Sequence, residues 1–127
     1  MATKVLTLTD GTQIVLLGYM RLKEYFWDAM RDAIEFRVDA SVLALAEADV
    51  LFTAENCQTL TIQDGDNESI TLRGYTVRME VARREVKEKV DDEAVFSSNI
   101  VVKMGVPSEA EELNRAMDEL LLEVLGV

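Results

Sequence analysis

The chain has 127 residues, 13 basic and 24 acidic side chains, a formal net charge of −11, one cysteine and no histidine. This length is typical of one domain with its own core, so we expect a single domain over residues 1–127. The missing histidine removes the commonest general base and a usual ligand of zinc and haem. The acidic charge disfavours binding to nucleic acid backbones or to anionic membranes.

The sequence gives no sign of a membrane segment or of secretion. No uninterrupted apolar run approaches the roughly 20 residues that a membrane-spanning helix needs, and the first residues lack the apolar stretch of a signal peptide. We therefore expect a cytoplasmic protein. The single cysteine, Cys57, cannot form an intramolecular disulfide, which agrees with a reducing compartment. We expect a buried, unreactive thiol, since no neighbouring basic residue would lower its pKa.

The first predicted element is a β-hairpin with arms at residues 5–9 and 12–19, joined by an Asp-Gly turn. Residues 20–31, which follow, fit either a helix or a continued strand. They contain three consecutive aromatic residues, which cannot all face one side of either element. Either two lie in the core and one is partly exposed, or they form an exposed contact patch, because aromatic residues are enriched at interfaces. These residues are Tyr25, Phe26 and Trp27.

A strand and a short helix are predicted in the middle of the chain. Residues 31–39 alternate cleanly between polar and apolar side chains. Apolar residues at helical spacing then indicate a helix over 41–52, with Ser41 as its expected N-cap and Asp39 as a weaker one. The inward-facing positions of the strand are Ile34, Phe36 and Val38.

A second hairpin, over residues 59–81, echoes the first. Thr-Leu-Thr, Asp-Gly and Gly-Tyr occur in the same order in both, with four fewer residues in the N-terminal copy. Adding residues in pairs preserves which side chains face inward. We therefore expect Gly18-Tyr19 and Gly74-Tyr75 to end hairpin arms at equivalent positions in one sheet system, with the two tyrosines at similar depth.

A longer hairpin is expected from arms at 75–88 and 94–104, with a charged turn between them at its tip. The apolar alternation changes phase near Arg83 and Arg84, and a β-bulge there would restore the register. One face of the second arm consists of Phe96, Ser98, Ile100, Val102 and Met104.

The most regular helix is predicted over residues 108–125, where Ser108 and Glu111 form a capping box. Its apolar stripe fits the a/d spacing of a coiled coil but covers only about two heptads. We expect the stripe to pack on the chain's own sheet, with binding to another copy or to a partner as the alternative. The stripe consists of Leu113, Met117, Leu120 and Val124.

Together these elements predict an α+β protein, mainly antiparallel β built from hairpins, with one short middle helix and a C-terminal amphipathic helix. Six or seven strands are expected in the strand-rich region 4–106. Turn formation explains the acidic residues at 64–68 without a metal, because the order of an EF-hand is missing. The acidic residues at 91–93 lie at a solvated loop tip, whereas a metal or acid/base site needs carboxylates held rigidly in a cleft. We therefore expect no catalytic residues, no cofactor and no metal. A salt-bridged sheet face explains the clustered arginines, with an acidic ligand or partner as the alternative; they are Arg73, Arg78, Arg83 and Arg84.

Four segments within residues 31–80 carry a family resemblance. They read Arg-Asp-Ala-Ile-Glu-Phe-Arg-Val from Arg31, Leu-Phe-Thr-Ala-Glu-Asn-Cys from Leu51, Leu-Thr-Ile from Leu60 and Gly-Tyr-Thr-Val-Arg from Gly74. In these segments the chain resembles small prophage-encoded proteins of Gram-positive bacteria, whose genes often lie beside tail or baseplate genes. The resemblance implies a non-catalytic structural or assembly role in a phage particle, and it assigns no role to any single residue.

The expected function is therefore that of a non-enzymatic phage-type structural or assembly protein that acts through protein–protein contacts. The expected partners are other protein subunits, including further copies bound through the C-terminal helix, and neither nucleic acid nor membranes. The candidate contact surfaces are that helix, the hairpin tip at 87–94 and the aromatic segment 25–27. The alternative is a small ligand- or carbohydrate-binding module that uses the aromatic segment. A deep pocket lined by Trp27 and Arg78 would favour this alternative.

Overall fold

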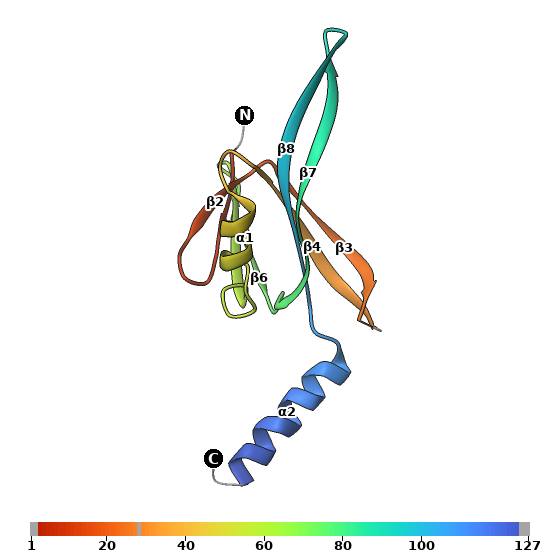
Figure 1. Ribbon diagram of the computed structural model, residues 1–127. Helices are drawn as coiled ribbons and strands as arrows, with labels where there is room; N and C mark the ends of the chain where they lie inside the picture. The colour runs from red at the N-terminus through yellow and green to blue at the C-terminus, as the bar shows by residue number, and fades with distance from the viewer. Residues whose placement is uncertain (1–2, 28, 125–127) are drawn as a thin grey trace.

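The computed structural model describes residues 3–27 and 29–124, with the side chains of residues 88, 90 and 122–124 outside that description. The described part contains two antiparallel four-stranded sheets and two helices, which confirms the predicted α+β class (Figure 1). Sheet A has the strand order β2-β1-β5-β6, and sheet B has the order β3-β4-β8-β7. The elements are β1 Lys4–Thr7, β2 Gln13–Leu16, β3 Gly18–Phe26, β4 Ala29–Asp39, α1 Leu45–Leu51, β5 Thr59–Asp64, β6 Ile70–Arg73, β7 Val77–Val90, β8 Glu93–Gly105 and α2 Glu109–Val124.

The ambiguous region 20–31 is strand rather than helix. β3 and β4 pair as a hairpin from Gly18 opposite Arg37 to Phe26 opposite Ala29. Trp27 turns the chain with a φ of 49°, a conformation that a bulky residue adopts rarely. This hairpin brings the number of described strands to eight, above the six or seven expected.

The fold contains an internal repeat. Each sheet consists of two hairpins joined side by side, through β1 and β5 in sheet A and through β4 and β8 in sheet B. Each half supplies one hairpin to sheet A, one hairpin to sheet B and then a helix. The chain therefore repeats a β-β-β-β-α unit around an approximate two-fold axis that passes between the central strands.

The register fixes how the halves correspond. Lys4 pairs with Leu16 and Leu60 pairs with Leu72, an offset of 56 residues at both positions (60 − 4 and 72 − 16). The Gly-Tyr pairs share this offset (74 − 18), so the two sheet A hairpins have the same length. The expectation of a first hairpin four residues shorter is wrong, because the two Thr-Leu-Thr triplets occupy different places in the register.

The Gly-Tyr pairs do occupy equivalent positions, although not within one sheet. Each lies where the chain crosses from a sheet A hairpin to the first strand of a sheet B hairpin. The tyrosines differ in depth, since Tyr75 is only 7% exposed whereas Tyr19 is half-buried. Gly74 makes its crossing with a φ of 83°, which a residue with a side chain adopts only with strain.

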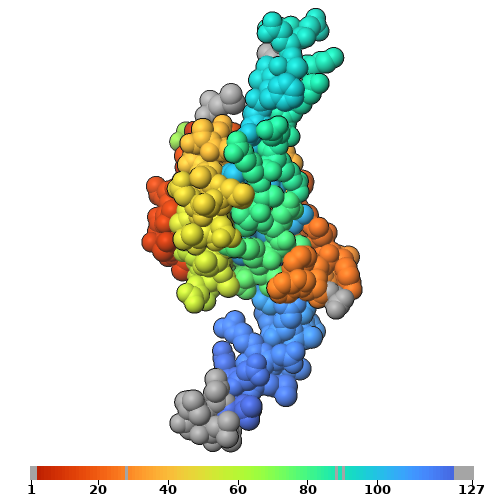
Figure 2. Space-filling view, in the orientation of Figure 1, coloured from red at the N-terminus to blue at the C-terminus, as the bar shows by residue number. Residues whose placement is uncertain are grey.

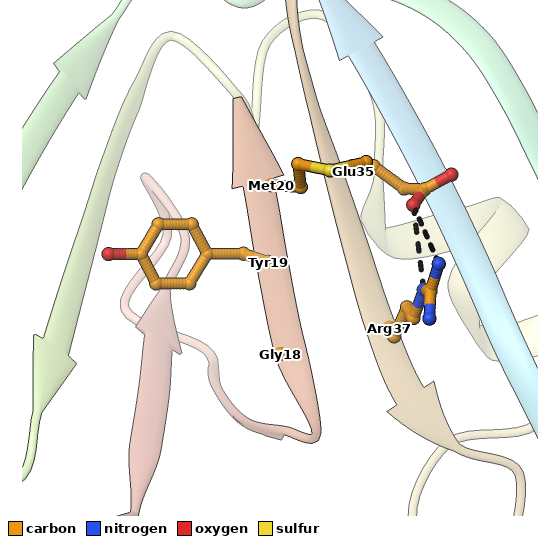
Figure 3. Close-up of a pocket in the computed structure, with 5 residues that line it drawn as sticks. All are labelled: Gly18, Tyr19, Met20, Glu35 and Arg37. Atoms are coloured by element: carbon orange, nitrogen blue, oxygen red, sulfur yellow. Dashed lines mark hydrogen bonds and ion pairs between the residues drawn. The ribbon is translucent and has the colours of Figure 1, made fainter. Parts of the chain in front are cut away.

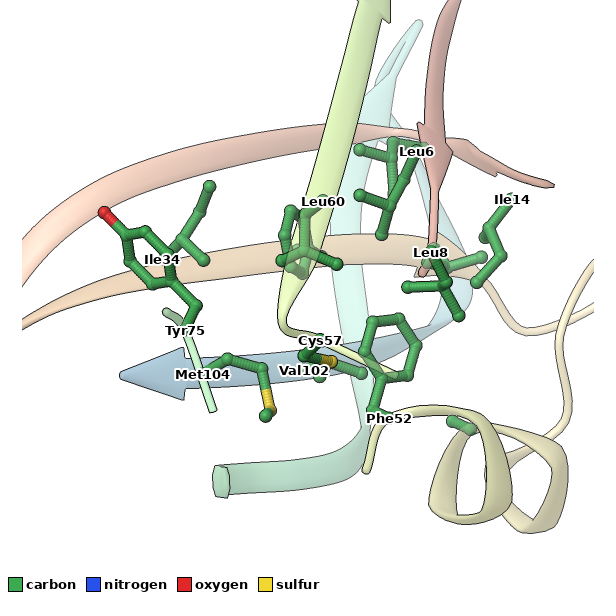
Figure 4. Close-up of a cluster of buried hydrophobic side chains, with 14 of the residues drawn as sticks. Leu6, Leu8, Ile14, Ile34, Phe52, Cys57, Leu60, Tyr75, Val102 and Met104 are labelled. Atoms are coloured by element: carbon green, nitrogen blue, oxygen red, sulfur yellow. The ribbon is translucent and has the colours of Figure 1, made fainter. Parts of the chain in front are cut away.

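The core lies between the two sheets and is closed by α1 (Figure 4). The inward positions predicted for the β4 segment are confirmed, since all three are fully buried. The ring of Phe52, just after α1, packs 6.1 Å from that of Phe36. The buried cluster is made of Leu6, Leu8, Ile14, Leu16, Ile34, Phe36, Val38, Leu43, Ala48, Phe52, Cys57, Leu60, Ile62, Leu72, Tyr75, Ile100, Val102 and Met104.

The start of α1 differs from the prediction. Ser41 is not its N-cap, because the helix begins at Leu45 and the N-cap position, Ala44, makes no side-chain cap. Asp39 instead accepts hydrogen bonds from the backbone N–H and the hydroxyl of Ser41, at 2.9 and 2.8 Å. This local bond holds residues 39–41 in a turn and delays the helix by one turn.

The β7–β8 hairpin is confirmed, and its tip extends well beyond the sandwich (Figures 1 and 2). The register shift lies between Arg78 and Glu80 rather than near Arg83. The alternation of polar and apolar residues changes near Arg83 because the β7–β8 hairpin leaves the sandwich there, so neither of its faces packs against sheet A. For the same reason Phe96 is 66% exposed, whereas Ile100, Val102 and Met104 on the same face of β8 are fully buried.

α2 points away from both sheets after the linker 106–108 (Figure 1). The helix itself is confirmed, while residue 125, its predicted end, lies outside the described residues. The expectation that its stripe packs on the chain's own sheet is wrong. Neither described helix is long and apolar enough to cross a membrane.

Candidate interaction surface

The base of α2 is held by the predicted capping box. The Glu111 N–H donates to Ser108 Oγ at 3.2 Å, and the same hydroxyl donates to the Glu111 carboxylate at 3.1 Å. This arrangement satisfies one of the free N–H groups in the first turn and places the Glu111 carboxylate beside the linker.

A buried arginine ties this first turn to the sandwich. The Arg31 side chain is 1% exposed and donates to Glu111 Oε1 at 2.6 Å. Its other donors reach the carbonyl of Val106 at 3.2 Å and the carbonyl of Phe26 at 3.1 and 2.7 Å. Arg31 therefore joins the β3–β4 hairpin, the end of β8 and α2. Sequence reasoning did not single it out, because no local pattern relates positions 31 and 111.

The same contacts lower the pKa of Glu111 below its ordinary value of 4.5. The hydrogen bond from Arg31 is the main cause, the Ser108 hydroxyl adds to it, and partial burial opposes both. The carboxylate thus stays ionised through mildly acidic conditions, and the charged tie to Arg31 persists with it.

Beyond its first turn, α2 is uncovered. Leu113, Met117 and Leu120 of the predicted stripe are 61%, 59% and 60% exposed, and Leu121 beside them is 57% exposed. The side chain of Val124, the fourth residue of the stripe, lies outside the described residues. The polar side is acidic, with Glu109, Glu112, Asp118 and Glu119 exposed around a single arginine, Arg115. The structure thus brings three of the predicted contact residues together on one open helix face.

The aromatic segment lies at the tip of the β3–β4 hairpin. Tyr25 is 63% and Trp27 69% exposed, whereas Phe26 is half-buried and stacks on Trp27 with ring centroids 5.0 Å apart. The expectation of two core aromatics is wrong, and the exposed-patch alternative fits.

Arg78 serves α1 rather than a ligand. Its guanidinium donates to the carbonyl of Phe52 at 3.0 and 2.6 Å and to the Asp49 carboxylate at 2.6 Å. This is the salt-bridged role expected for the arginine cluster, and Arg84 pairs similarly with Glu80. Arg78 lies on β7 and Trp27 follows β3, the opposite edges of sheet B, so they do not line one pocket.

A shallow hollow of about 250 Å³ lies beside β3 and β4 (Figure 3). Figure 3 shows Met20, Glu35 and Arg37 on one side of the strands and Tyr19 on the other. The Glu35 carboxylate is buried but neutralised by Arg37 at 3.5 Å. Among the residues that the structure describes, no group of three or more acidic or cysteine side chains is placed to hold a metal.

Cys57 is fully buried, as predicted. Burial raises the pKa of its thiol to about 12. The expectation that no basic residue lies nearby is wrong, because the fold brings Arg78 close, but its positive charge opposes the effect of burial only in part. A thiol that remains protonated and inaccessible is a poor nucleophile and metal ligand.

Comparisons of the chain with protein-family models, with curated proteins and with solved structures find no match. Function is therefore inferred from the surfaces described above, together with the resemblance at residues 31–80.

Proposed function

We propose that this protein is a non-enzymatic phage-type structural or assembly protein that acts through protein–protein contacts made by α2. The observation that carries the proposal is the open stripe of Leu113, Met117 and Leu120, each about 60% exposed on a helix whose base is firmly held.

Two physical arguments support a partner for this stripe. Complete burial of a leucine or methionine side chain stabilises by about 1.5–3 kcal/mol, so covering the stripe would gain several kcal/mol. A helix of 16 residues is also marginal in water without tertiary packing. A binding surface that covers α2 would thus stabilise both the helix and the assembly.

The particle context of the proposal rests on the resemblance to small prophage-encoded proteins. In a lysogen that carries the gene, its deletion is expected to block or alter particle assembly as seen by electron microscopy. The wild-type gene should restore assembly and Leu120→Glu should not, while Glu112→Gln on the polar side serves as the matched control. Normal particles after deletion, or full rescue by Leu120→Glu, would contradict the proposal.

The exposure of Tyr25 and Trp27 keeps a carbohydrate- or ligand-binding module as a second candidate. Exposed aromatic rings can stack on sugar faces. Calorimetric titration with oligosaccharides tests this, with Trp27→Ala as the control variant. Absence of binding by the wild-type protein would remove this candidate.

A further inference from the structure

One row of residues across the inner face of sheet B shows the internal repeat most directly. Arg21 on β3 pairs with Ile34 on β4, Ile34 pairs with Met104 on β8, and Met104 pairs with Arg78 on β7. Ile34 and Met104 are both fully buried in the centre. The approximate two-fold axis therefore relates the two arginines, one on each edge strand.

The two arginines differ in what they bind. Arg78 holds a helix, through the carbonyl that follows α1 and through Asp49 of α1. Arg21 is exposed, and its guanidinium has no hydrogen-bond or ion-pair partner within residues 3–27 and 29–124. The edge of sheet B at β7 is thus covered by a helix, whereas the equivalent edge at β3 is not.

α2 is the helix that the repeat would place on the β3 edge. It follows β8 as α1 follows β4. Arg78 binds Asp49 of α1, and large apolar residues follow Asp49 two and three positions later, at Leu51 and Phe52. The sequence of α2 has the same spacing, with Leu120 and Leu121 two and three positions after Asp118. α2 therefore carries a carboxylate and two large apolar side chains in the order that α1 uses.

The chemistry of the β3 edge complements that of α2. Arg21 and Lys23 are exposed there, and with Leu22, Asp32, Ala33 and Tyr75 they line a hollow of about 340 Å³ that is open to solvent. Lys23 pairs with Asp32 at 3.7 Å, so Arg21 is the cation of this edge that is left for an acidic partner. α2 is acidic on its polar side and apolar along its stripe. Within one chain α2 does not reach the β3 edge, because the ion pair between Arg31 and Glu111 holds its first turn so that the helix points away from the sheets (Figure 1).

We propose that α2 of one copy docks on β3 of a second copy, over Arg21, in the place that α1 occupies over β7 within each copy. This inference rests on the proposed function and names the partner of α2 as the same chain. The contact joins two different surfaces, so reciprocal exchange closes a dimer and one-way exchange builds a ring or a chain. It also covers an edge strand that would otherwise be free to pair.

Sedimentation velocity over a range of concentrations tests the contact with three variants. Leu120→Glu alters the donor helix and Arg21→Glu alters the acceptor strand. Each is expected to weaken self-association by at least about tenfold, because each leaves a charge unpaired or buried in the contact. Arg73→Glu, the same charge change on exposed β6 of sheet A, should associate like the wild type. Circular dichroism checks that all variants are folded.

Mixing the variants is decisive. Leu120→Glu retains an intact β3 edge and Arg21→Glu retains an intact α2, so an equimolar mixture should recover one contact and form a heterodimer. If Arg21→Glu associates like the wild type while Leu120→Glu does not, α2 binds elsewhere: the docking site is overturned and the proposed role of α2 stands. A wild-type protein that stays monomeric at every concentration overturns the inference. The proposed function is tested separately, by whether Leu120→Glu restores particle assembly in the deletion strain.

Discussion

Removing the Arg31 side chain should destabilise the whole sandwich, not only the attachment of α2. In Arg31→Ala the carbonyls of Phe26 and Val106 lose a charged donor, and the Glu111 carboxylate loses its only basic partner among the described residues. A hydrogen bond to a charged group contributes about 1.5–3 kcal/mol, and Arg31 donates such bonds to two carbonyls. The Glu111 carboxylate left behind is 35% exposed, so its loss of a partner adds little. We expect the free energy of unfolding to fall by about 3–6 kcal/mol.

Glu111→Gln should cost much less, about 1 kcal/mol, because Glu111 is 35% exposed and solvent screens its charge. Glu112→Gln, at the next and exposed position, should change stability by less than about 0.5 kcal/mol. Urea unfolding followed by circular dichroism measures all three. Equal stabilities for Arg31→Ala and Glu112→Gln would refute the account of Arg31 as the residue that joins three elements.

The pH dependence gives an independent check with a definite sign. The folded-state pKa of Glu111 is lowered, so its contribution is present above its ordinary pKa of 4.5 and is lost as the pH falls through the lower folded value. The stability difference between the wild type and Glu111→Gln should therefore be constant near neutral pH and shrink in acid. A difference that grows as the pH falls below 4.5 would contradict this assignment.

Three further predictions concern the body of the protein. In Gly105→Ala the new Cβ would lie 2.7 Å from Sδ of Met79 and 2.8 Å from Cδ of Arg31, so thermal unfolding should show a loss of about 1–3 kcal/mol. Unchanged stability would mean that both side chains shift freely. Cys57 should resist a thiol reagent in the folded protein and react fully in urea, because it is fully buried. Its pKa is raised on folding, so the free energy of unfolding should decline above pH 9, where the thiol ionises in the unfolded chain but not in the folded protein. Ile14→Ala should cost more than the repeat-equivalent Ile70→Ala in urea unfolding, since Ile14 is 4% and Ile70 37% exposed; equal costs would argue against this difference between the halves.

Alternating polarity predicted the hairpins and the inward face of β4, and the Gly-Tyr echo pointed to the repeat. The same alternation could not fix how the halves correspond. The Thr-Leu-Thr triplets imply an offset of 52 residues and the strand register an offset of 56 (59 − 7 and 60 − 4). Both offsets are even, so both keep the apolar side chains on one face. The Gly-Tyr pairs already carry the offset of 56 (74 − 18), so the sequence contains both values, and strand pairing, which is non-local, decides between them.

The candidate surface shows the same limit. The capping box and the apolar spacing predicted α2, because these signals lie within a few residues of one another. What covers the stripe depends on the direction in which the helix leaves the sandwich. That direction is set by Arg31 and Glu111, which are 80 residues apart in the sequence. The β7 bulge was predicted near Arg83 rather than between Arg78 and Glu80 for a related reason. Where a strand leaves the sandwich, its alternation of polar and apolar residues changes, and in the sequence this looks the same as a bulge.

Hydrogen–deuterium exchange of the α2 backbone, measured as a function of protein concentration, tests most directly whether this helix is a contact surface. A free 16-residue helix should exchange rapidly, because little holds its hydrogen bonds closed. We predict that protection of residues 112–124 rises with concentration in the wild type and stays low in Leu120→Glu. Strong protection at the lowest concentration, unchanged by Leu120→Glu, would show that α2 packs on its own chain and would contradict the account.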